Sequence, residues 1–272
     1  MTHRRAWIGI IGNGFVARSL AARIADDRGL GLEVAFVAAR RPGAGELGLG
    51  ALSAALIEER GADLVVEAAH PDLTRAHGRA ILSTTDYLPL STTALVDDGL
   101  RTELEATALA AGTRLVLPHG ALVGGDSLLE WREQWAEVTI TFRKHPRAID
   151  FAASGIDPAG ITGPTTLYDG PVRGIAPLFP RNVNTMVTCA LADRGAGCLS
   201  GRAGVRSRAG CGRGGGGRGR PGRIAPGDRQ VAARGRRERD RDDGVAAPLD
   251  PGRHRTAGAP RAGVTRSALH LG

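Results

Sequence analysis

The stretch GIIGNGFVA, residues 9–17, decides how the first half of the chain folds. Gly12, Gly14 and Ala17 match the pattern G-x-G-x-x-[G/A]. In this pattern the first glycine permits a tight turn, the second lets a pyrophosphate approach the backbone, and the third small residue lets a helix pack closely on a strand. An apolar run precedes the motif and helical spacing follows it over residues 15–25. This strand–turn–helix context predicts a dinucleotide site at a helix N-terminus.

The turn itself is predicted to contact the cofactor. A glycine turn without a ligand is the alternative, and the surrounding pattern favours the cofactor site. We expect the cofactor-binding residues of this segment to be Gly12, Asn13, Gly14, Phe15 and Val16.

Strands and helices are predicted to alternate over the first 120 residues. Such alternation indicates βαβ units around a parallel sheet, and the nearly continuous apolar strands fit a sheet that is covered on both faces. We therefore predict an α/β fold, with a Rossmann-type doubly wound parallel sheet over residues 1–120. The predicted strands are 7–11, 32–38, 63–67, 87–90 and 113–117, and the predicted helices are 15–25, 52–59, 71–82 and 102–111.

The remaining sequence has two different textures. Residues 121–192 predict a partial α+β catalytic or substrate domain, with a helix over 128–135, an alternating strand over 136–143, a strand over 165–168 and helices within 174–191. Residues 193–272 contain many Gly and Arg, no Phe, Trp or Tyr, and no sustained period. Such a composition cannot bury enough apolar surface to offset the entropy of ordering, so we predict a disordered tail.

The positive charge of the chain belongs to this tail. The net charge is +8, but residues 193–272 carry 18 Arg against 7 acidic residues, so the preceding residues are slightly acidic. A nucleic-acid-binding function would therefore have to act through the Gly-Arg tail. Because the tail lacks aromatic side chains for base stacking, we consider that function unlikely.

Cysteine usage and hydropathy indicate the cellular compartment of the protein. Cys189, Cys198 and Cys211 have no paired spacing, which argues against a disulfide framework and against a metal site. No apolar run is long enough to span a bilayer. We expect a cytoplasmic protein with no membrane partner.

Two arginines bear on the choice of cofactor. Arg40 and Arg41 stand where the second strand is predicted to end, and no Asp or Glu occurs between Val34 and Gly45. A carboxylate at this place binds the ribose 2′-hydroxyl of NAD, whereas Arg suits the 2′-phosphate of NADP. We therefore include Arg40 in the site and expect NADP(H) to bind at least as well as NAD(H). The alternative is that both arginines are solvated turn residues.

Several further segments resemble the L-aspartate dehydrogenase family. They are VVEAAHP (65–71), LPHGALVGGD (117–126), RKHP (143–146) and LFPRNVN (178–184), and the resemblance covers about residues 7–192. It implies oxidation of L-aspartate to iminoaspartate with NAD or NADP, or the reverse amination of oxaloacetate, by a homodimer. It also implies cofactor contacts by Ala121 and Asn184. From the residues alone, Ala121 can equally be a plain turn residue and Asn184 a helix cap.

The catalytic residue of that family has no counterpart in this chain. The resemblance places a general acid–base His about 30 residues beyond Asn184, but no His occurs between His145 and His254. His119, in the turn between the two predicted domains, is the only nearby substitute, and a surface or capping role is its alternative. We therefore expect cofactor binding with impaired catalysis. Another NADP-dependent oxidoreductase acting on an amino acid or keto acid is the alternative function.

The abrupt change after Ala192 suggests a shifted reading frame. Arg outnumbers Lys by 35 to 1 across the chain, which indicates a GC-rich gene. Shifted frames of such genes tend to encode Arg, Gly, Ala and Pro, the residues that dominate the tail. We predict that the tail from Asp193 is an out-of-frame translation of an ordinary C-terminus of the same family.

Overall fold

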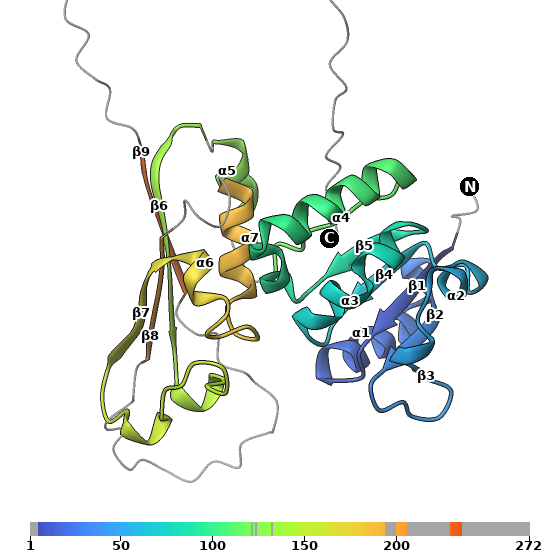
Figure 1. Ribbon diagram of the computed structural model, residues 1–272, viewed down its shortest axis with the longest axis horizontal. Coiled ribbons are helices and arrows are strands. Elements are labelled where there is room, and N and C mark those ends of the chain that lie inside the picture. The colour runs from blue at the N-terminus through green and yellow to red at the C-terminus, as the bar shows by residue number, and fades with distance from the viewer. Residues whose placement is uncertain are drawn as a thin grey trace, which may run out of the picture. The chain divides into compact units, whose positions relative to one another are not determined.

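A computed structural model gives the fold (Figure 1). It describes residues 5–120, 122, 124–131, 133–193, 200–205 and 229–235. Compactness divides the chain into residues 1–236 and residues 237–272, and every element named below lies in the first of these units.

The first half contains a five-stranded parallel sheet with the order β3-β2-β1-β4-β5. The order reverses beside β1, and in such sheets ligands bind at the carboxyl ends of the strands at the point of reversal. This confirms the predicted Rossmann-type fold. The strands are β1 (Ala6–Ile11), β2 (Leu32–Ala39), β3 (Leu47–Gly48), β4 (Leu64–Glu67) and β5 (Asp86–Pro89).

Helices connect these strands, and local signals set their ends. They are α1 (Phe15–Asp26), α2 (Ala54–Glu59), α3 (Pro71–Leu82) and α4 (Asp98–Ala111). The α4 helix begins four residues before its predicted start, because the Asp97 carboxylate accepts a hydrogen bond from Leu100 N at 3.1 Å. It ends at Gly112, which adopts the left-handed conformation that favours glycine. The predicted strand 113–117 is wrong, because only Leu115 forms a bridge, to Tyr87.

Apolar side chains cover both faces of this sheet. Ile8 and Ile10 of β1 pack with Ala17 and Ile24 of α1, whereas the next residue, Ile11, packs in the cluster on the other face. The alternation of side chains along a strand produces this division.

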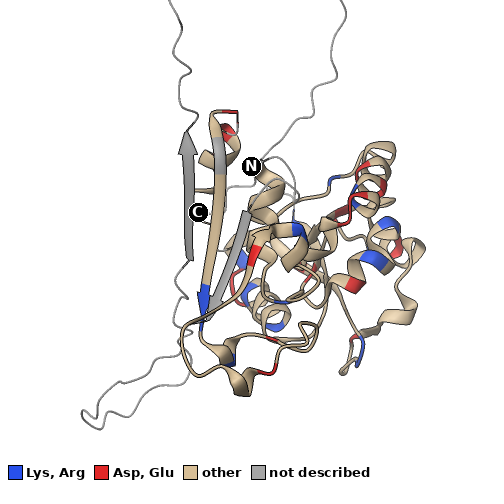
Figure 2. Ribbon diagram, turned by 60° about the vertical axis from the view of Figure 1, so that its left-hand side comes forward, with Lys and Arg blue, Asp and Glu red and all other residues tan. Residues whose placement is uncertain are grey.

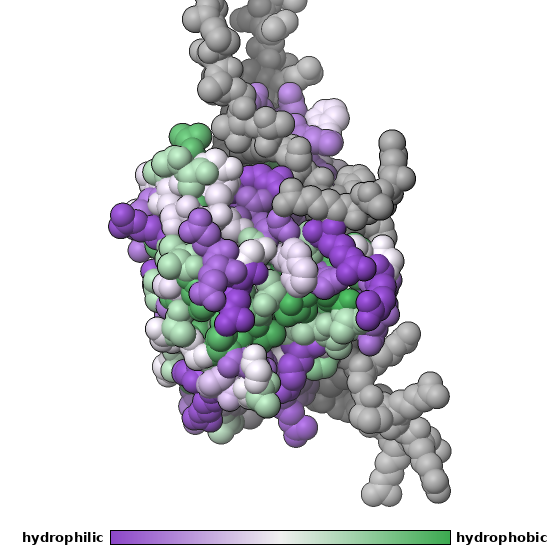
Figure 3. Space-filling model, turned by 90° about the vertical axis from the view of Figure 1, so that its right-hand side faces the viewer, coloured by the Kyte–Doolittle hydropathy of each residue, from purple (hydrophilic) through white to green (hydrophobic). Residues whose placement is uncertain are grey.

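The surface in Figure 3 shows a band of apolar side chains bordered by polar ones. Basic and acidic residues are interspersed over the described part of the chain (Figure 2).

The second half contains a four-stranded mixed sheet with the order β7-β8-β6-β9. The central β6 pairs in parallel with β8 and antiparallel with β9. Val138, Ile140 and Phe142 of β6 pack on the short helices of this half. Its elements are α5 (Gly125–Glu130), β6 (Trp135–Lys144), β7 (Thr165–Pro171), α6 (Val172–Ile175), α7 (Asn184–Asp193), β8 (Ser200–Val205) and β9 (Arg229–Gly235).

Two predictions for this half need correction. The helix expected over 128–135 ends at Glu130, because Trp131 leaves the helical conformation, and Trp135 already begins β6. The expectation of no regular structure after Asp193 is wrong for 200–205 and 229–235. Backbone pairing along both edges of β6 requires no apolar side chains, so Gly- and Arg-containing segments can supply it. The rest of the tail predicted to be disordered lies outside the described residues.

Candidate functional site

The first glycine of the fingerprint is required by its backbone. Gly12 has φ +115°, a conformation that side chains with a Cβ rarely adopt. A Cβ there would also lie 2.9 Å from the carbonyl oxygen of Ala68, in the turn that follows β4. The Gly12 N–H donates to Ala38 O of β2 at 2.7 Å. This turn therefore joins the carboxyl ends of three neighbouring strands.

The second glycine is required by the space beside it. Gly14 has φ −71° and no side chain caps α1 at this position. A Cβ on Gly14 would meet no heavy atom within 4 Å. The following Phe15 and Val16 are 73% and 52% exposed, whereas Ala17 is buried against β1. An uncapped first helical turn with open space before it fits a pyrophosphate group, so these residues fit the predicted dinucleotide.

A carboxylate that the sequence argument missed lies beside this turn. Glu46 Oε2 accepts hydrogen bonds from Gly43 N at 2.8 Å and Asn13 Nδ2 at 3.0 Å. These two bonds lower the pKa of Glu46. The Asn13 amide also donates to Arg41 O at 2.9 Å, so the predicted Asn13 holds the β2–β3 connection against the glycine turn. Arg40 follows the end of β2, as expected, and its side chain is exposed.

A buried carboxylate holds the turn after β4. Glu67 has no exposed surface, and its Oε1 accepts from Ala69 N at 2.6 Å and His70 N at 2.7 Å. Ser91 donates to the same carboxylate from its backbone N–H and its hydroxyl group, at 3.1 and 3.0 Å. Burial raises the pKa of Glu67, and the four donated hydrogen bonds only partly oppose that effect. Glu67 thereby fixes the two loops that leave β4 and β5.

The 3-10 helix η3 (Thr92–Val96) connects this region to the predicted cofactor contact Asn184. Asn184 Oδ1 accepts from Thr93 N at 3.2 Å, and Asn184 O accepts from the Thr92 hydroxyl at 2.7 Å. The Thr93 hydroxyl donates to Pro180 O at 2.7 Å. The start of α7 is therefore held at the carboxyl end of the parallel sheet, which is where a bound dinucleotide would lie.

The connecting loop also lies against the start of α7. A Cβ on Gly120 would lie 3.4 Å from the Thr185 hydroxyl oxygen. His119 is half exposed, and its Nε2 lies 3.5 Å from Asp126 Oδ1. The predicted contact Ala121 lies outside the described residues. The structure thus brings His119 and Asn184 to the same region and supplies His119 with an acidic neighbour.

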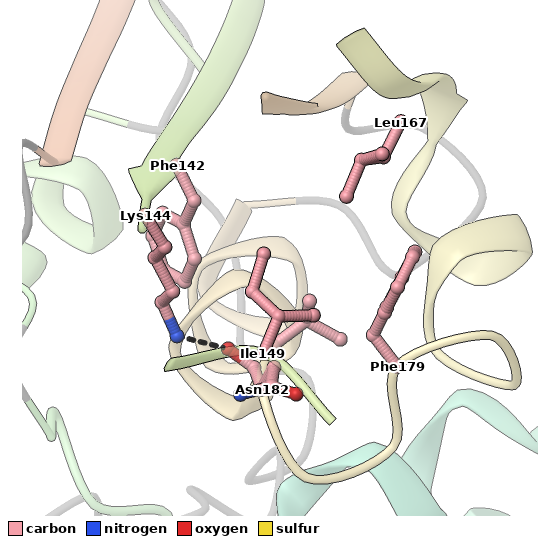
Figure 4. A pocket seen from close by; sticks show the side chains of 7 residues that line it. Phe142, Lys144, Ile149, Leu167, Phe179 and Asn182 are labelled. Atoms are coloured by element: carbon pink, nitrogen blue, oxygen red, sulfur yellow. Dashed lines mark hydrogen bonds between the residues drawn. The ribbon is translucent and has the colours of Figure 1, made fainter. Parts of the chain in front are cut away.

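A narrow apolar pocket lies at the end of β6 (Figure 4). Lys144 Nζ donates to Asn182 O at 2.9 Å, and the Asn182 side chain bonds to Asp150 N and Ala148 O. Asn182 thus holds the loop after β6 and does not cap α7. The pocket contains few polar groups and lies away from the glycine turn, so it does not fit a dinucleotide. Its lining residues are Phe142, Lys144, Ile149, Leu167, Phe179, Asn182 and Val183.

Comparison with known proteins decides the family. The family model described as aspartate dehydrogenase, C-terminal, matches residues 129–203, and that of the homoserine dehydrogenase NAD binding domain matches residues 12–118. An aspartate dehydrogenase domain-containing protein of Xenopus tropicalis is 34% identical over 198 residues, which is 70% of each chain. L-aspartate dehydrogenase 2 of Bordetella pertussis is 37% identical over 205 residues, 72% of this chain and 75% of that one. The chain belongs to the aspartate dehydrogenase family.

A solved structure agrees with this assignment at the level of the fold. The crystal structure of aspartate dehydrogenase from Thermotoga maritima aligns with a TM-score of 0.58 at 23% identity, over 74% of this chain and 79% of that chain. The chain is therefore an NAD(P)-dependent oxidoreductase of this family. The C-terminal family match ends at residue 203, so the resemblance continues past the break predicted at Ala192. The segment that extends it includes most of β8.

Two of the missed site residues carried a signal in the sequence. Glu67 is an acidic residue at the end of an apolar strand, and a charge in that place is costly unless it is hydrogen-bonded. Glu46 lies one residue beyond the window in which an acid was sought after β2. The contacts of Thr92 and Thr93 carried no comparable signal, because they join residues about 90 positions apart.

Proposed function

We propose that the chain is an NAD(P)-dependent L-aspartate dehydrogenase that binds its cofactor and has greatly reduced turnover. The observation that carries this proposal is the uncapped, open first turn of α1 beside Gly14, in a chain of this family. The substrate is a small molecule, L-aspartate in one direction and oxaloacetate with ammonia in the other. The nicotinamide would accept a hydride from the substrate Cα, which leaves iminoaspartate.

The residues of the chain supply binding and orientation. The helix N-terminus at Gly14, Phe15 and Val16 offers N–H donors and a positive dipole end to the pyrophosphate. Gly12 lets this turn pass close to the strand ends, and Asn184 is held beside them by Thr93. We keep Ala121 in the proposed cofactor site because of the family resemblance. We keep Arg40 there because of its charge.

Proton transfer is the weak step of the proposed reaction. Loss of the hydride from Cα requires that a base take a proton from the substrate ammonium group, and a well-placed His contributes about 10²–10⁴-fold to such a proton transfer. His119 is the described histidine of the connecting loop, and Asp126 lies near enough to orient its ring. We propose His119 as a partial substitute for the family His. The His119→Ala variant should lower kcat further and leave the affinity for the dinucleotide unchanged.

A substrate profile tests the proposed function. The full 272-residue chain should reduce NAD or NADP slowly with L-aspartate, and much more slowly still with L-glutamate, L-alanine or L-homoserine. A faster rate with one of these amino acids would instead support an oxidoreductase for another substrate. A rate that persists after Gly14→Val would show that the measured activity comes from a contaminant.

Assembly and location remain proposals as well. The family resemblance supports a homodimer, and light scattering after size-exclusion chromatography would measure the mass in solution. The cysteine usage supports a cytoplasmic location. In the described part of the chain, no helix is long and apolar enough to cross a membrane.

A further inference from the structure

We propose that Glu46 selects NAD(H) over NADP(H), by accepting a hydrogen bond from the adenosine ribose and repelling a 2′-phosphate. The proposal rests on the proposed function only in that a dinucleotide binds at the glycine turn. It reverses the preference that Arg40 and Arg41 suggested from the sequence. The structure places a carboxylate at this site that does not come from the end of β2.

The sheet explains how Glu46 reaches the turn. The chain leaves β2, turns at Gly43, where Glu46 N donates to Gly43 O at 3.1 Å, and enters the short β3. Because β3 pairs in parallel with the last residues of β2, Glu46 comes to lie beside the carboxyl end of β2. A ribose-binding acid is needed at this edge of a Rossmann sheet. The neighbouring strand thus delivers the group that the end of β2 lacks.

The hydrogen bonds of Glu46 leave it ready to accept another. Both donors, Asn13 Nδ2 and Gly43 N, bond to Oε2. Among the described residues, none donates a hydrogen bond to Oε1 of Glu46. These donors favour the ionised carboxylate, which accepts hydrogen bonds from hydroxyl groups. Since Asn13 lies between Gly12 and Gly14, the carboxylate is fixed to the turn that would hold the pyrophosphate.

The arginines have no comparable anchor. Arg40 and Arg41 are exposed, and within the described ranges neither guanidinium group forms an ion pair with an acidic side chain. Within the part of the chain that the structure describes, the one side-chain hydrogen bond to this pair is donated by the Asn13 amide to the backbone oxygen of Arg41. A long, solvated side chain loses rotamer entropy when it binds a phosphate, whereas the carboxylate of Glu46 is already held. Arg18 also acts on Glu46 through its charge, but Glu46 is the charged group that hydrogen bonds hold at this turn, so we expect it to decide the preference.

Isothermal titration of the full chain with NAD⁺ and with NADP⁺ tests this proposal. The unmodified chain should bind NAD⁺ at least about tenfold more tightly. Glu46→Gln keeps the size of the side chain and removes its charge, so it should bind NADP⁺ about tenfold more tightly than the unmodified chain does and lose or reverse the preference. Adding Arg40→Ala and Arg41→Ala to this variant should remove the gain, because these side chains would then supply the phosphate contacts.

Glu59→Gln is the matched control. It removes the same charge from an exposed position on α2, and it should leave the ratio of the two affinities unchanged. Equal or tighter binding of NADP⁺ by the unmodified chain would overturn the proposal, even if Glu46→Gln failed to fold. An unchanged ratio in a folded Glu46→Gln variant would overturn it too. Failure of both dinucleotides to bind would overturn the proposed function as well, so the two failures are distinguishable.

Discussion

The two sheets of this chain depend on different ranges of the sequence. All five strands of the parallel sheet come from residues 6–89, and the central strand β1 lies between β2 and β4. The four-stranded sheet has β6 near its middle, and both neighbours of β6 come from beyond residue 199. The first sheet is thus complete before the Gly-Arg-rich region begins, while the second depends on it. This contrast explains why we expect the protein to retain cofactor binding while its turnover is greatly reduced.

The largest effect is expected on turnover, and restoring the reading frame would test it. Deletion of one base between codon 192, where the break was predicted, and codon 203, where the family match ends, should replace the tail with a family-like C-terminus that carries the missing His. Turnover of L-aspartate should then rise by about 10²–10⁴-fold, the contribution of a general acid–base, while the affinity for the dinucleotide changes little. Steady-state kinetics and titration calorimetry on both proteins measure the two quantities. Robust turnover by the 272-residue chain, or the absence of an alternative open frame, would contradict the shifted-frame hypothesis.

Gly14→Val should abolish binding in the first half without unfolding it. The valine side chain would fill the open space before α1, where the pyrophosphate is expected, so micromolar dinucleotide binding should fall below detection by calorimetry. Gly48→Val is the matched control, because Gly48 has φ −72° and likewise no heavy atom within 4 Å of an added Cβ. That variant should bind normally. Unchanged binding by Gly14→Val would show that the cofactor does not lie at this turn.

A pair of core substitutions should show whether each half of the chain can lose stability without the other. Ile10 and Ile140 are both fully buried, one in β1 and one in β6. Either Ile→Ala change should cost about 2–5 kcal/mol of the free energy of unfolding of the sheet that contains it. We expect Ile140→Ala to retain dinucleotide binding and Ile10→Ala to lose it on mild heating. Calorimetry at increasing temperature measures the binding. If both variants lose binding at the same temperature, the two halves unfold as one unit.

The smallest effect is expected from an ion pair that joins the halves. Arg173 of α6 donates to Asp98 of α4 at 2.7 Å. Burial alone would raise the pKa of Asp98, but the hydrogen bond and charge of Arg173, together with Arg101, lower it overall. A lowered carboxyl pKa stabilises the folded state above the ordinary value of 3.8, and this stabilisation is lost as the pH falls through the lower folded value. Arg173→Met should therefore lower Tm slightly near neutral pH, and the difference from the unmodified chain should disappear at acidic pH. A difference that grows on acidification would contradict this assignment.

Local patterns were enough to predict most elements of the first half of the chain, but not β3 or the absence of a strand over 113–117. The α3 helix has the predicted bounds because Pro71 occupies its first position and His70 caps it, and both signals are local. The position of Gly12 likewise follows from a nine-residue motif. The second half was harder, because β8 and β9 lack the alternating apolar residues that make a strand recognisable. Their pairing follows from the unsatisfied edges of β6, which no short window of sequence contains.

The same distinction applies to the site. Gly14, Phe15 and Val16 belong to one motif, and the structure gives them the expected open arrangement. Glu46 was missed because its role depends on a turn and on a two-residue strand that carried no signal of their own. Asn184 was proposed from family resemblance, but its contact with Thr93 could not be inferred from either segment alone.

That contact restricts what Asn184 can recognise. A backbone N–H can only donate, so the atom that faces Thr93 N must be the amide oxygen, and the orientation of the side-chain amide is unambiguous. The NH₂ group is consequently the part of the amide that is directed to other partners. A ligand group that meets this NH₂ must present a lone pair, as a carboxamide oxygen, a ribose oxygen or a carboxylate does. In the proposed cofactor contact, the fold of the chain therefore sets the orientation of the amide before any ligand arrives.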